Sequence, residues 1–311
     1  MTTPRRRRHD PLPPVEAGAT PGHPATTVDL HAHTTRSDGV VGPVALVLQA
    51  FEVGVRTFAL TDHDTLAGYR EVVVDRAVPD GMSLLPGVEI NAIVTRDLGL
   101  WEGELHILGL GMDPDDAVFE ATLSSQRDRR RIRFERTVER LRAIDLAIDA
   151  QVADLDPGDG DALGRPTIAR ALIAAGHATS VEDAFRRLLG WGCPGYVPRE
   201  GLGPAEAIAA IRAAGGLASL AHFSEAPARI PVLRELVDAG LGGLEVYYRS
   251  FDAGTVTMVA AVAAMLGLVP TGGTDYHGDT GTYAESHARS WVPPEVGDGV
   301  RAAIGVGSPP D

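Results

Sequence analysis

The chain has 311 residues, of which 44% are hydrophobic, and its formal net charge at pH 7 is −14. This length allows one large α/β domain or one domain with an insertion, and the acidic balance argues against stable binding of duplex nucleic acid through a basic surface. The single cysteine, Cys193, excludes an internal disulfide, and this cysteine usage is typical of a cytoplasmic protein. The sequence contains no run of about 18 apolar residues, so we expect no membrane span.

Residues 1–25 differ in composition from the rest of the chain. They contain the basic run Arg5–Arg8, followed by prolines and small polar residues instead of an apolar segment. This pattern is not that of a secretory signal, and we expect a disordered tail.

Short β-like runs then alternate with amphipathic helical segments. The expected strands are Val28–His33, Thr57–Thr61, Ser83–Glu89, Leu105–Gly109, Leu217–His222, Gly243–Tyr248 and Val269–Thr274. The expected helices between them are Pro43–Val53, Leu66–Arg76, Pro204–Ala214, Ile230–Ala239 and Ala253–Leu266. The alternation predicts parallel strands with crossover helices, and seven strands favour a closed or nearly closed barrel over a doubly wound sheet. No glycine-rich phosphate loop follows the first strand, which weakens a nucleotide-binding doubly wound fold.

One stretch interrupts the alternation. No strand is expected from residue 115 to residue 199, where Ala117–Ile144 and Pro166–Leu189 have helical patterns. Arginines interleaved with acids in the first of these helices predict a solvated face with i, i+4 pairs. We therefore divide the chain into a first barrel part, a helical insertion that caps the substrate, a second barrel part and a C-terminal segment, with the bounds 26–114, 115–199, 200–285 and 286–311.

Histidines and acids gather at the ends of the expected strands. His31 and His33 are two residues apart, so on a strand their side chains point to the same side. Six of the ten histidines belong to this set, which is His31, His33, Asp38, Asp62, His63, Asp64, Glu89, His106, His222, Asp275 and His277. Functional side chains gather at the C-terminal face of parallel barrels. The pattern therefore predicts a multinuclear metal centre there.

These motifs together resemble the PHP (polymerase and histidinol phosphatase) family of metal-dependent phosphoesterases. The resemblance spans residues 26–280 and is carried by Asp29–His33, Leu60–Asp64, Pro86–Ile90, His106–Gly109, Leu220–His222 and Gly273–His277. It implies an α/β fold, a distorted (β/α)7 barrel with a trinuclear metal site.

The resemblance also implies which residues bind each of three divalent ions. The first ion takes His31, His33, Glu89 and Asp275; the second shares Glu89 as a bridge and adds His106 and His222; the third takes Asp38, His63 and His277. Imidazole and carboxylate ligands suit Mn, Fe or Zn, and the sequence does not choose among them. A hydroxide bridging two of the ions would attack phosphorus. Catalytic roles then fall to Glu89, as the bridge, and to Asp64, as proton donor or as a partner that orients His63.

The insertion suggests the substrate class. The segments 164–170 and 194–199 resemble those of a subgroup that includes nucleoside 3′,5′-bisphosphate phosphatases and 5′→3′ oligoribonucleotide exonucleases. The resemblance implies that Arg165 and Arg199 bind phosphate, since a guanidinium group matches phosphate oxygens in a bidentate manner. The subgroup commonly has His where this chain has Thr167. The expected substrate is a small nucleotide or the 5′ end of a short RNA.

Three other functions stay open. A histidinol-phosphate-type or other small-molecule phosphomonoesterase would use the same barrel. An amidohydrolase-like hydrolase also begins with His-x-His, but this chain has no lysine to carboxylate as a bridge between metals. A non-catalytic metal-storing or regulatory domain would be expected to lack some ligands, yet every expected ligand position is filled.

Overall fold

The computed structural model describes residues 26–94, 100, 103–153, 161–278 and 281–306. The predicted tail 1–25 and the last five residues of the predicted C-terminal segment lie outside these ranges. Among the described residues no helix is long and apolar enough to cross a membrane.

Seven strands of the described chain form one sheet in sequence order. They are β1 (Val28–Asp29), β2 (Thr57–Leu60), β3 (Ser83–Val94), β4 (Gly103–Leu110), β5 (Leu217–Leu220), β6 (Gly243–Tyr248) and β7 (Val269–Gly273). The sheet closes between its first and last strands, because the Leu30 N–H donates to Gly272 O at 3.0 Å and the Asp275 N–H donates to His31 O at 2.7 Å. The predicted distorted seven-stranded barrel is confirmed.

The expectation of parallel strands throughout is wrong for β4. This strand runs antiparallel to both β3 and β5, while the other neighbouring pairs in the described sheet are parallel. β3 also continues five residues beyond the predicted end, to Val94. Only eight residues separate β3 from β4, too few for a crossover helix, so the two strands form a hairpin.

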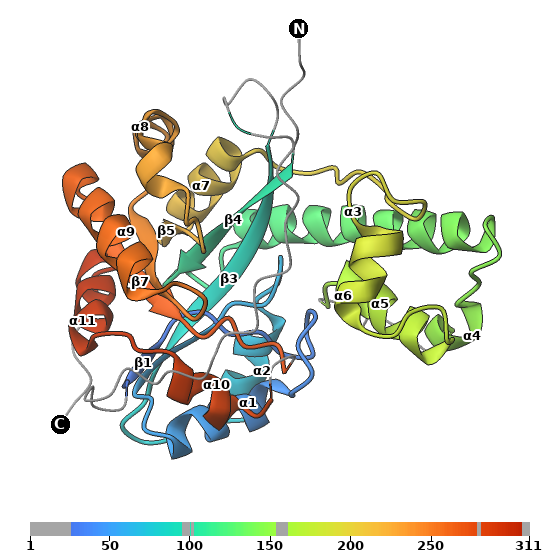
Figure 1. Ribbon diagram of the computed structural model, residues 1–311. Coiled ribbons are helices and arrows are strands. Elements are labelled where there is room, and N and C mark those ends of the chain that lie inside the picture. The colour runs from blue at the N-terminus through green and yellow to red at the C-terminus, as the bar shows by residue number, and fades with distance from the viewer. Residues whose placement is uncertain (1–25, 95–99, 101–102, 154–160, 279–280, 307–311) are drawn as a thin grey trace, which may run out of the picture.

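Helices cover the outside of the barrel (Figure 1). They are α1 (Pro43–Glu52), α2 (Ala67–Val74), α7 (Pro204–Ala213), the short 3₁₀ helix η3 (Ala226–Ala228), α8 (Ile230–Asp238), α9 (Ala253–Leu266), α10 (Tyr283–Arg289) and α11 (Pro294–Ala303). A large apolar core joins β3–β6 to α7–α9, and a second one joins β2 to α1 and α2. Val296 and Val300 of α11 pack with Val28 and Leu85 near the starts of strands, so α11 covers the end of the barrel opposite to the C-terminal ends of the parallel strands.

The helical segment between β4 and α7 projects from one side of the barrel (Figure 1). It contains the long helix α3 (Ala117–Arg142), then α4 (Asp149–Val152), α5 (Arg165–Ala174), α6 (Val181–Ala184) and the π-helix η2 (Phe185–Leu189). The predicted single helix Pro166–Leu189 is wrong. Gly176 has a φ of 78°, in the left-handed region, just after α5 ends, and Ser180 caps a new helix. This segment has its own apolar core, which includes Leu141, Ile168 and Leu172.

Candidate metal centre

The nine residues predicted to bind metal lie together at one end of the barrel. His31 and His33 follow β1, Asp38 lies in the loop before α1, and His63 follows β2. Glu89 lies within β3, His222 lies two residues after the end of β5, and Asp275 and His277 follow β7. His106 is the fourth residue of β4, and because β4 is antiparallel its start lies at the end of the barrel where the parallel strands finish. The antiparallel strand therefore contributes its imidazole to the same site as the others.

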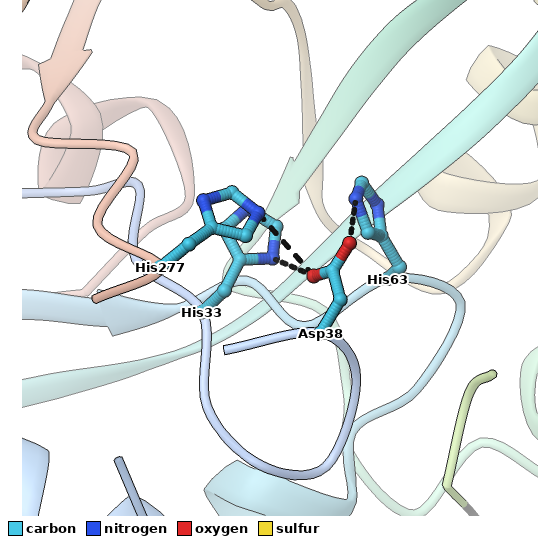
Figure 2. A group of neighbouring side chains, drawn as sticks. All are labelled: His33, Asp38, His63 and His277. Atoms are coloured by element: carbon cyan, nitrogen blue, oxygen red, sulfur yellow. Dashed lines mark ion pairs between the residues drawn. The ribbon is translucent and has the colours of Figure 1, made fainter. Parts of the chain in front are cut away.

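The nine side chains form three groups whose candidate ligand atoms lie within 4.8 Å of one another. One group, drawn in Figure 2, surrounds the Asp38 carboxylate, which lies 3.3 Å from His277 Nε2 and 3.5 Å from His63 Nε2. The three groups are His33, Asp38, His63 and His277; His31, His33, Glu89 and Asp275; and Glu89, His106 and His222. His33 belongs to two of them, as does Glu89.

Glu89 lies at the middle of the cluster. Its Oε1 atom is 2.7 Å from His106 Nδ1 and 3.3 Å from His222 Nε2. Its Oε2 atom is 3.1 Å from both His33 Nε2 and His63 Nδ1. One carboxylate thus contacts imidazoles of all three groups, which is the position required of a residue that bridges two cations.

Several buried imidazole nitrogens point into the cluster without satisfying their hydrogen-bonding capacity. Within the described part of the chain, His31 Nε2, His63 Nδ1 and both ring nitrogens of His33 form no hydrogen bond of suitable geometry, although Glu89 Oε2 lies 3.1 Å from His33 Nε2 and from His63 Nδ1. Buried polar atoms are rarely left unpaired, and three buried carboxylates beside them favour positive charge. Divalent cations would satisfy both the lone pairs and the carboxylates. The donor set therefore fits divalent metals that accept nitrogen and oxygen ligands.

The protonation of these groups follows from burial and from their neighbours. Burial lowers the pKa of His63 to about 3, which keeps its imidazole in the neutral form that binds metals. Burial alone would raise the pKa of the Glu89 carboxyl, but the imidazoles of His106, His63 and His31 hold that pKa well below its usual range. His277 differs, because the attraction of Asp38 and Asp275 outweighs burial and raises its pKa to about 10. Without a metal, the carboxylates thus hold protons on some of the imidazoles.

β6 supplies a supporting carboxylate that the sequence analysis missed. Glu245 is fully buried, with Oε1 2.9 Å from His31 Nδ1. Its other oxygen accepts the backbone N–H of His222 at 2.6 Å, where the backbone has an unfavourable φ of 35°. Glu245 therefore orients ligands of two different groups.

A cavity of about 140 Å³ opens beside the cluster. Asp38, His63 and His106 form part of its wall, and α3, α5 and η2 of the insertion provide much of the rest. The insertion side combines apolar side chains with arginines, and these residues are Arg130, Arg133, Phe134, Leu163, Arg165, Pro166, Ile168, Phe185 and Arg199. The cavity therefore lies between the cluster of predicted metal ligands and the insertion.

Both arginines predicted to bind phosphate line this cavity. The Arg165 side chain is 28% exposed, whereas that of Arg199 is 7% exposed and lies 2.7 Å from Asp64 Oδ2. Thr167, in contrast, is not among the described residues that line the cavity, and its hydroxyl lies 3.5 Å from Arg170 Nη2.

Two further arginines of the cavity were missed because the arginine-rich face of α3 was interpreted as solvated. Arg130 and Arg133 are buried and face the cavity, whereas Arg131 and Arg136 are exposed, as expected. Arg130 pairs with Asp64 and Asn91. The buried positions of α3 follow a helical stripe that could have been recognised, and this stripe is Phe119, Leu123, Gln126, Arg130, Arg133, Thr137, Val138 and Leu141.

The environment of Asp64 argues against its predicted role as a proton donor. Its side chain is fully buried between Arg130 and Arg199. Although burial would raise its pKa, the charges of these two arginines hold that pKa below its usual range, so the carboxyl carries no proton near neutral pH. Asp64 instead fixes the two arginines beside the cavity.

Comparisons with known proteins agree with this site. No family model matches the chain. Over 280 residues the chain is 33% identical to the 5′-3′ exoribonuclease Rnm of Escherichia coli (strain K12), an alignment that covers 88% of this chain and 92% of the relative. It is 31% identical over 260 residues to a 3′,5′-nucleoside bisphosphate phosphatase of Chromobacterium violaceum, covering 80% of this chain and 87% of that protein.

A solved structure resembles the whole arrangement. It comes from Bifidobacterium adolescentis, is assigned to the metal-dependent phosphoesterases, and matches with a TM-score of 0.77 and 31% sequence identity over 90% of this chain and 97% of its own. The relatives and this structure agree with the clustered imidazoles and carboxylates at the end of the barrel. The chain therefore belongs to the PHP family of metal-dependent phosphoesterases, which hydrolyse phosphate esters.

Proposed function

We propose that this enzyme hydrolyses phosphate esters of small nucleotides, either nucleoside 3′,5′-bisphosphates or the 5′ ends of short RNA. The main support is the cavity, which has the metal cluster on one side and Arg165 and Arg199 on the other. A substrate there can place one phosphate at the cluster and a second at the arginines. The names of the two relatives, an exoribonuclease and a bisphosphate phosphatase, point to the same substrates.

Three divalent ions, Mn, Fe or Zn, are proposed to occupy the three groups of ligands. In this assignment His31, His33, Glu89 and Asp275 would hold the first ion, Glu89 would be shared with the second, which His106 and His222 would also hold, and Asp38, His63 and His277 would hold the third. When bound, such ions supply Lewis acidity that activates water for attack on phosphorus and neutralises charge on the phosphoryl oxygens.

The protein's own side chains have separate tasks in this proposal. The carboxylate of Glu89 holds two ligand groups at a fixed separation, and Glu245 keeps His31 and the His222 backbone in place. Arg165 and Arg199 orient the phosphate that is not hydrolysed. Asp64 pairs with Arg199 at 2.7 Å and so holds its guanidinium group at the cavity wall.

The size and lining of the cavity limit the substrate. A volume of about 140 Å³ suits part of one nucleotide and excludes a duplex. Phe134, Ile168 and Phe185 provide apolar surface next to the arginines, which suits a base or ribose beside a phosphate.

A substrate panel tests the proposal. The enzyme loaded with Mn should hydrolyse a nucleoside 3′,5′-bisphosphate or a 5′-phosphorylated short RNA with a kcat/KM at least about tenfold above that for histidinol phosphate or a simple aryl phosphate, because one additional charged contact is worth roughly that factor. Removal of metal by a chelator should abolish every activity. A clear preference for histidinol phosphate would contradict the nucleotide assignment while leaving the phosphoesterase assignment intact.

A further inference from the structure

The cavity beside the metal cluster already contains an anion supplied by the protein. Glu104 of β4 lines the cavity. Its Oε1 atom lies 3.2 Å from Arg133 Nη1 and 3.5 Å from Arg165 Nη2, and its Oε2 atom lies 3.8 Å from Arg199 Nη1. Three arginines from α3, α5 and the segment after η2 therefore converge on one carboxylate.

Positive charge exceeds negative charge in this arginine cluster, which we define as Arg130, Arg133, Arg165 and Arg199. Among the described residues, two carboxylates, Asp64 and Glu104, form ion pairs with these four guanidinium groups. Asp64 is fully buried behind them, and Asp38, the other carboxylate of the cavity wall, belongs to the metal cluster, so Glu104 is the carboxylate that pairs with the arginines in the cavity. Buried charge of one sign is unfavourable unless it is paired, and a bound anion would supply the missing negative charge.

Hydrogen-bond donors in the cluster are also unused. Among the described residues, no partner exists for the buried atoms Arg133 Nη2 and Arg199 Nε, and both side chains are at least nine-tenths buried. Burial and the nearby Arg165 lower the pKa of Arg133 to about 10. Glu104 therefore satisfies the cluster only in part, because one carboxylate offers two oxygens to three guanidinium groups.

We propose that Glu104 is a specificity-determining residue, an internal counter-anion that occupies the arginine cluster until a second substrate phosphate displaces it. The inference rests on the proposed function. A phosphate offers three oxygens and up to two charges, so it competes well with a carboxylate for bidentate contacts. A substrate with one phosphate places it at the metals and gains nothing at the arginines, which stay paired with Glu104. Glu104 thus makes binding at the arginine cluster depend on the second phosphate.

The variant Glu104→Gln tests this role, because it keeps the shape of the side chain and removes the charge. The matched control is Glu120→Gln. Glu120 also pairs with two arginines, Arg70 and Arg127, each at 2.6 Å, but it is not among the described residues that line the cavity. The measurements on metal-loaded enzyme are the dissociation constant of sulfate by titration calorimetry, and kcat and KM for a nucleoside 3′,5′-bisphosphate and for the 5′-monophosphate.

Glu104→Gln should bind sulfate roughly 10- to 100-fold more tightly, because it removes a competing charge a few ångströms from the anion. The KM for the bisphosphate should fall by a similar factor, whereas kcat and the KM for the monophosphate should change by less than about threefold. Glu120→Gln should match the wild type in every measurement. If a folded Glu104→Gln variant binds sulfate equally or more weakly, Glu104 merely orients the arginines and the inference is wrong.

Two further comparisons keep the outcomes distinct. If Glu104→Gln does not fold, Glu104→Asp provides the test, since it draws the carboxylate back without removing its charge. Its sulfate affinity should exceed that of the wild type, and an affinity at or below the wild-type value would overturn the inference. If the enzyme hydrolyses no nucleotide, the proposed function fails, whereas the sulfate measurements still decide the role of Glu104.

Discussion

At the scale of single residues, Glu89 lies at the centre of the proposed metal cluster. Its two carboxylate oxygens lie within 3.5 Å of nitrogens of five imidazoles, those of His31, His33, His63, His106 and His222. Loss of its charge would leave two groups of ligands without the anion that they share. Loss of the Glu89 charge should therefore affect metal binding and turnover more than folding.

Glu89→Gln should lower kcat by at least about 100-fold, since even residues that only support metal ligands change affinity or activity by 10- to 100-fold. The amide has the same shape, so the thermal unfolding temperature of the metal-free protein should change by only a few degrees. Steady-state kinetics, calorimetry and metal analysis of the purified variant measure these effects. A variant that keeps most of the wild-type activity and its full metal content would show that Glu89 is not a bridge.

Arg165 provides the most direct test of phosphate recognition. It is more exposed than Arg199, and its removal leaves the fully buried Asp64 paired as before, whereas Arg199→Ala would remove one of the two arginines that pair with Asp64. Arg165→Ala should reduce kcat/KM for a nucleoside 3′,5′-bisphosphate by about 10- to 100-fold, because a charge-assisted contact is worth roughly 1.5–3 kcal/mol. Activity on an aryl phosphate should change little.

The control is Arg136→Ala, which removes an exposed arginine of α3 that pairs with Glu200 and is not among the described residues lining the cavity. It should leave both activities unchanged. Equal losses on the two substrates in Arg165→Ala would mean that Arg165 acts on the reacting phosphate or on folding.

The residues differ in how well sequence reveals them. His31 and His33 are recognisable because their spacing on a strand forces both imidazoles to one side. Arg130 and Arg133 are harder to recognise, since an arginine-rich helix is usually solvated, and only the buried stripe that continues from Leu123 to Leu141 sets them apart. Glu245 gives no signal at all, because an isolated acid in a strand is informative only when its neighbours in space are known.

At the scale of elements, β4 combines an irregular topology with a functional position. Periodicity predicts this strand well but says nothing of its direction, which depends on the short connection to β3. The reversal brings His106 to the metal cluster and Glu104, two residues earlier, to the arginine cluster. β4 thereby contributes one side chain to the metal cluster and one to the arginine cluster, on the two sides of the cavity.

The insertion has an apolar core of its own, so a substitution in that core should destabilise the insertion without destabilising the barrel. Leu141 of α3 is fully buried in that core. Leu141→Ala should cost about 2–5 kcal/mol of stability, measured by urea unfolding, because it leaves a cavity. Since α3 and α5 carry Arg133 and Arg165, the KM for the bisphosphate should rise while the metal content stays unchanged.

Ile144→Ala is the matched control, because Ile144 lies three residues further along and is 39% exposed. It should change stability by less than about 0.5 kcal/mol. If Leu141→Ala lost bound metal as well as stability, the insertion and the barrel with its metal cluster would not be independent of each other.

At the scale of the whole molecule, the charge distribution differs strongly between the surface and the site. The chain as a whole has a formal charge of −14, yet the cavity has an excess of arginines and the cluster beside it has sites for cations. Such a molecule repels long polyanions at its surface and attracts a small anion only where the cavity opens. Net charge read from composition predicts the repulsion of long polyanions but cannot reveal the anion-binding cavity, because the arginines that line it come from distant parts of the chain.

The proposed metal ligands come from nearly every strand of the barrel, so metal binding should stabilise the fold as a whole. Cations that bind only the folded state add about 4 kcal/mol per site when their concentration is 1,000 times the dissociation constant. Removal of metal by a chelator should therefore lower the thermal unfolding temperature by roughly 10 °C, and added Mn should restore it. Elemental analysis of the reconstituted protein should approach three ions per chain, one for each group of ligands. A ceiling of one ion, or an unfolding temperature that does not respond to metal, would contradict the trinuclear assignment.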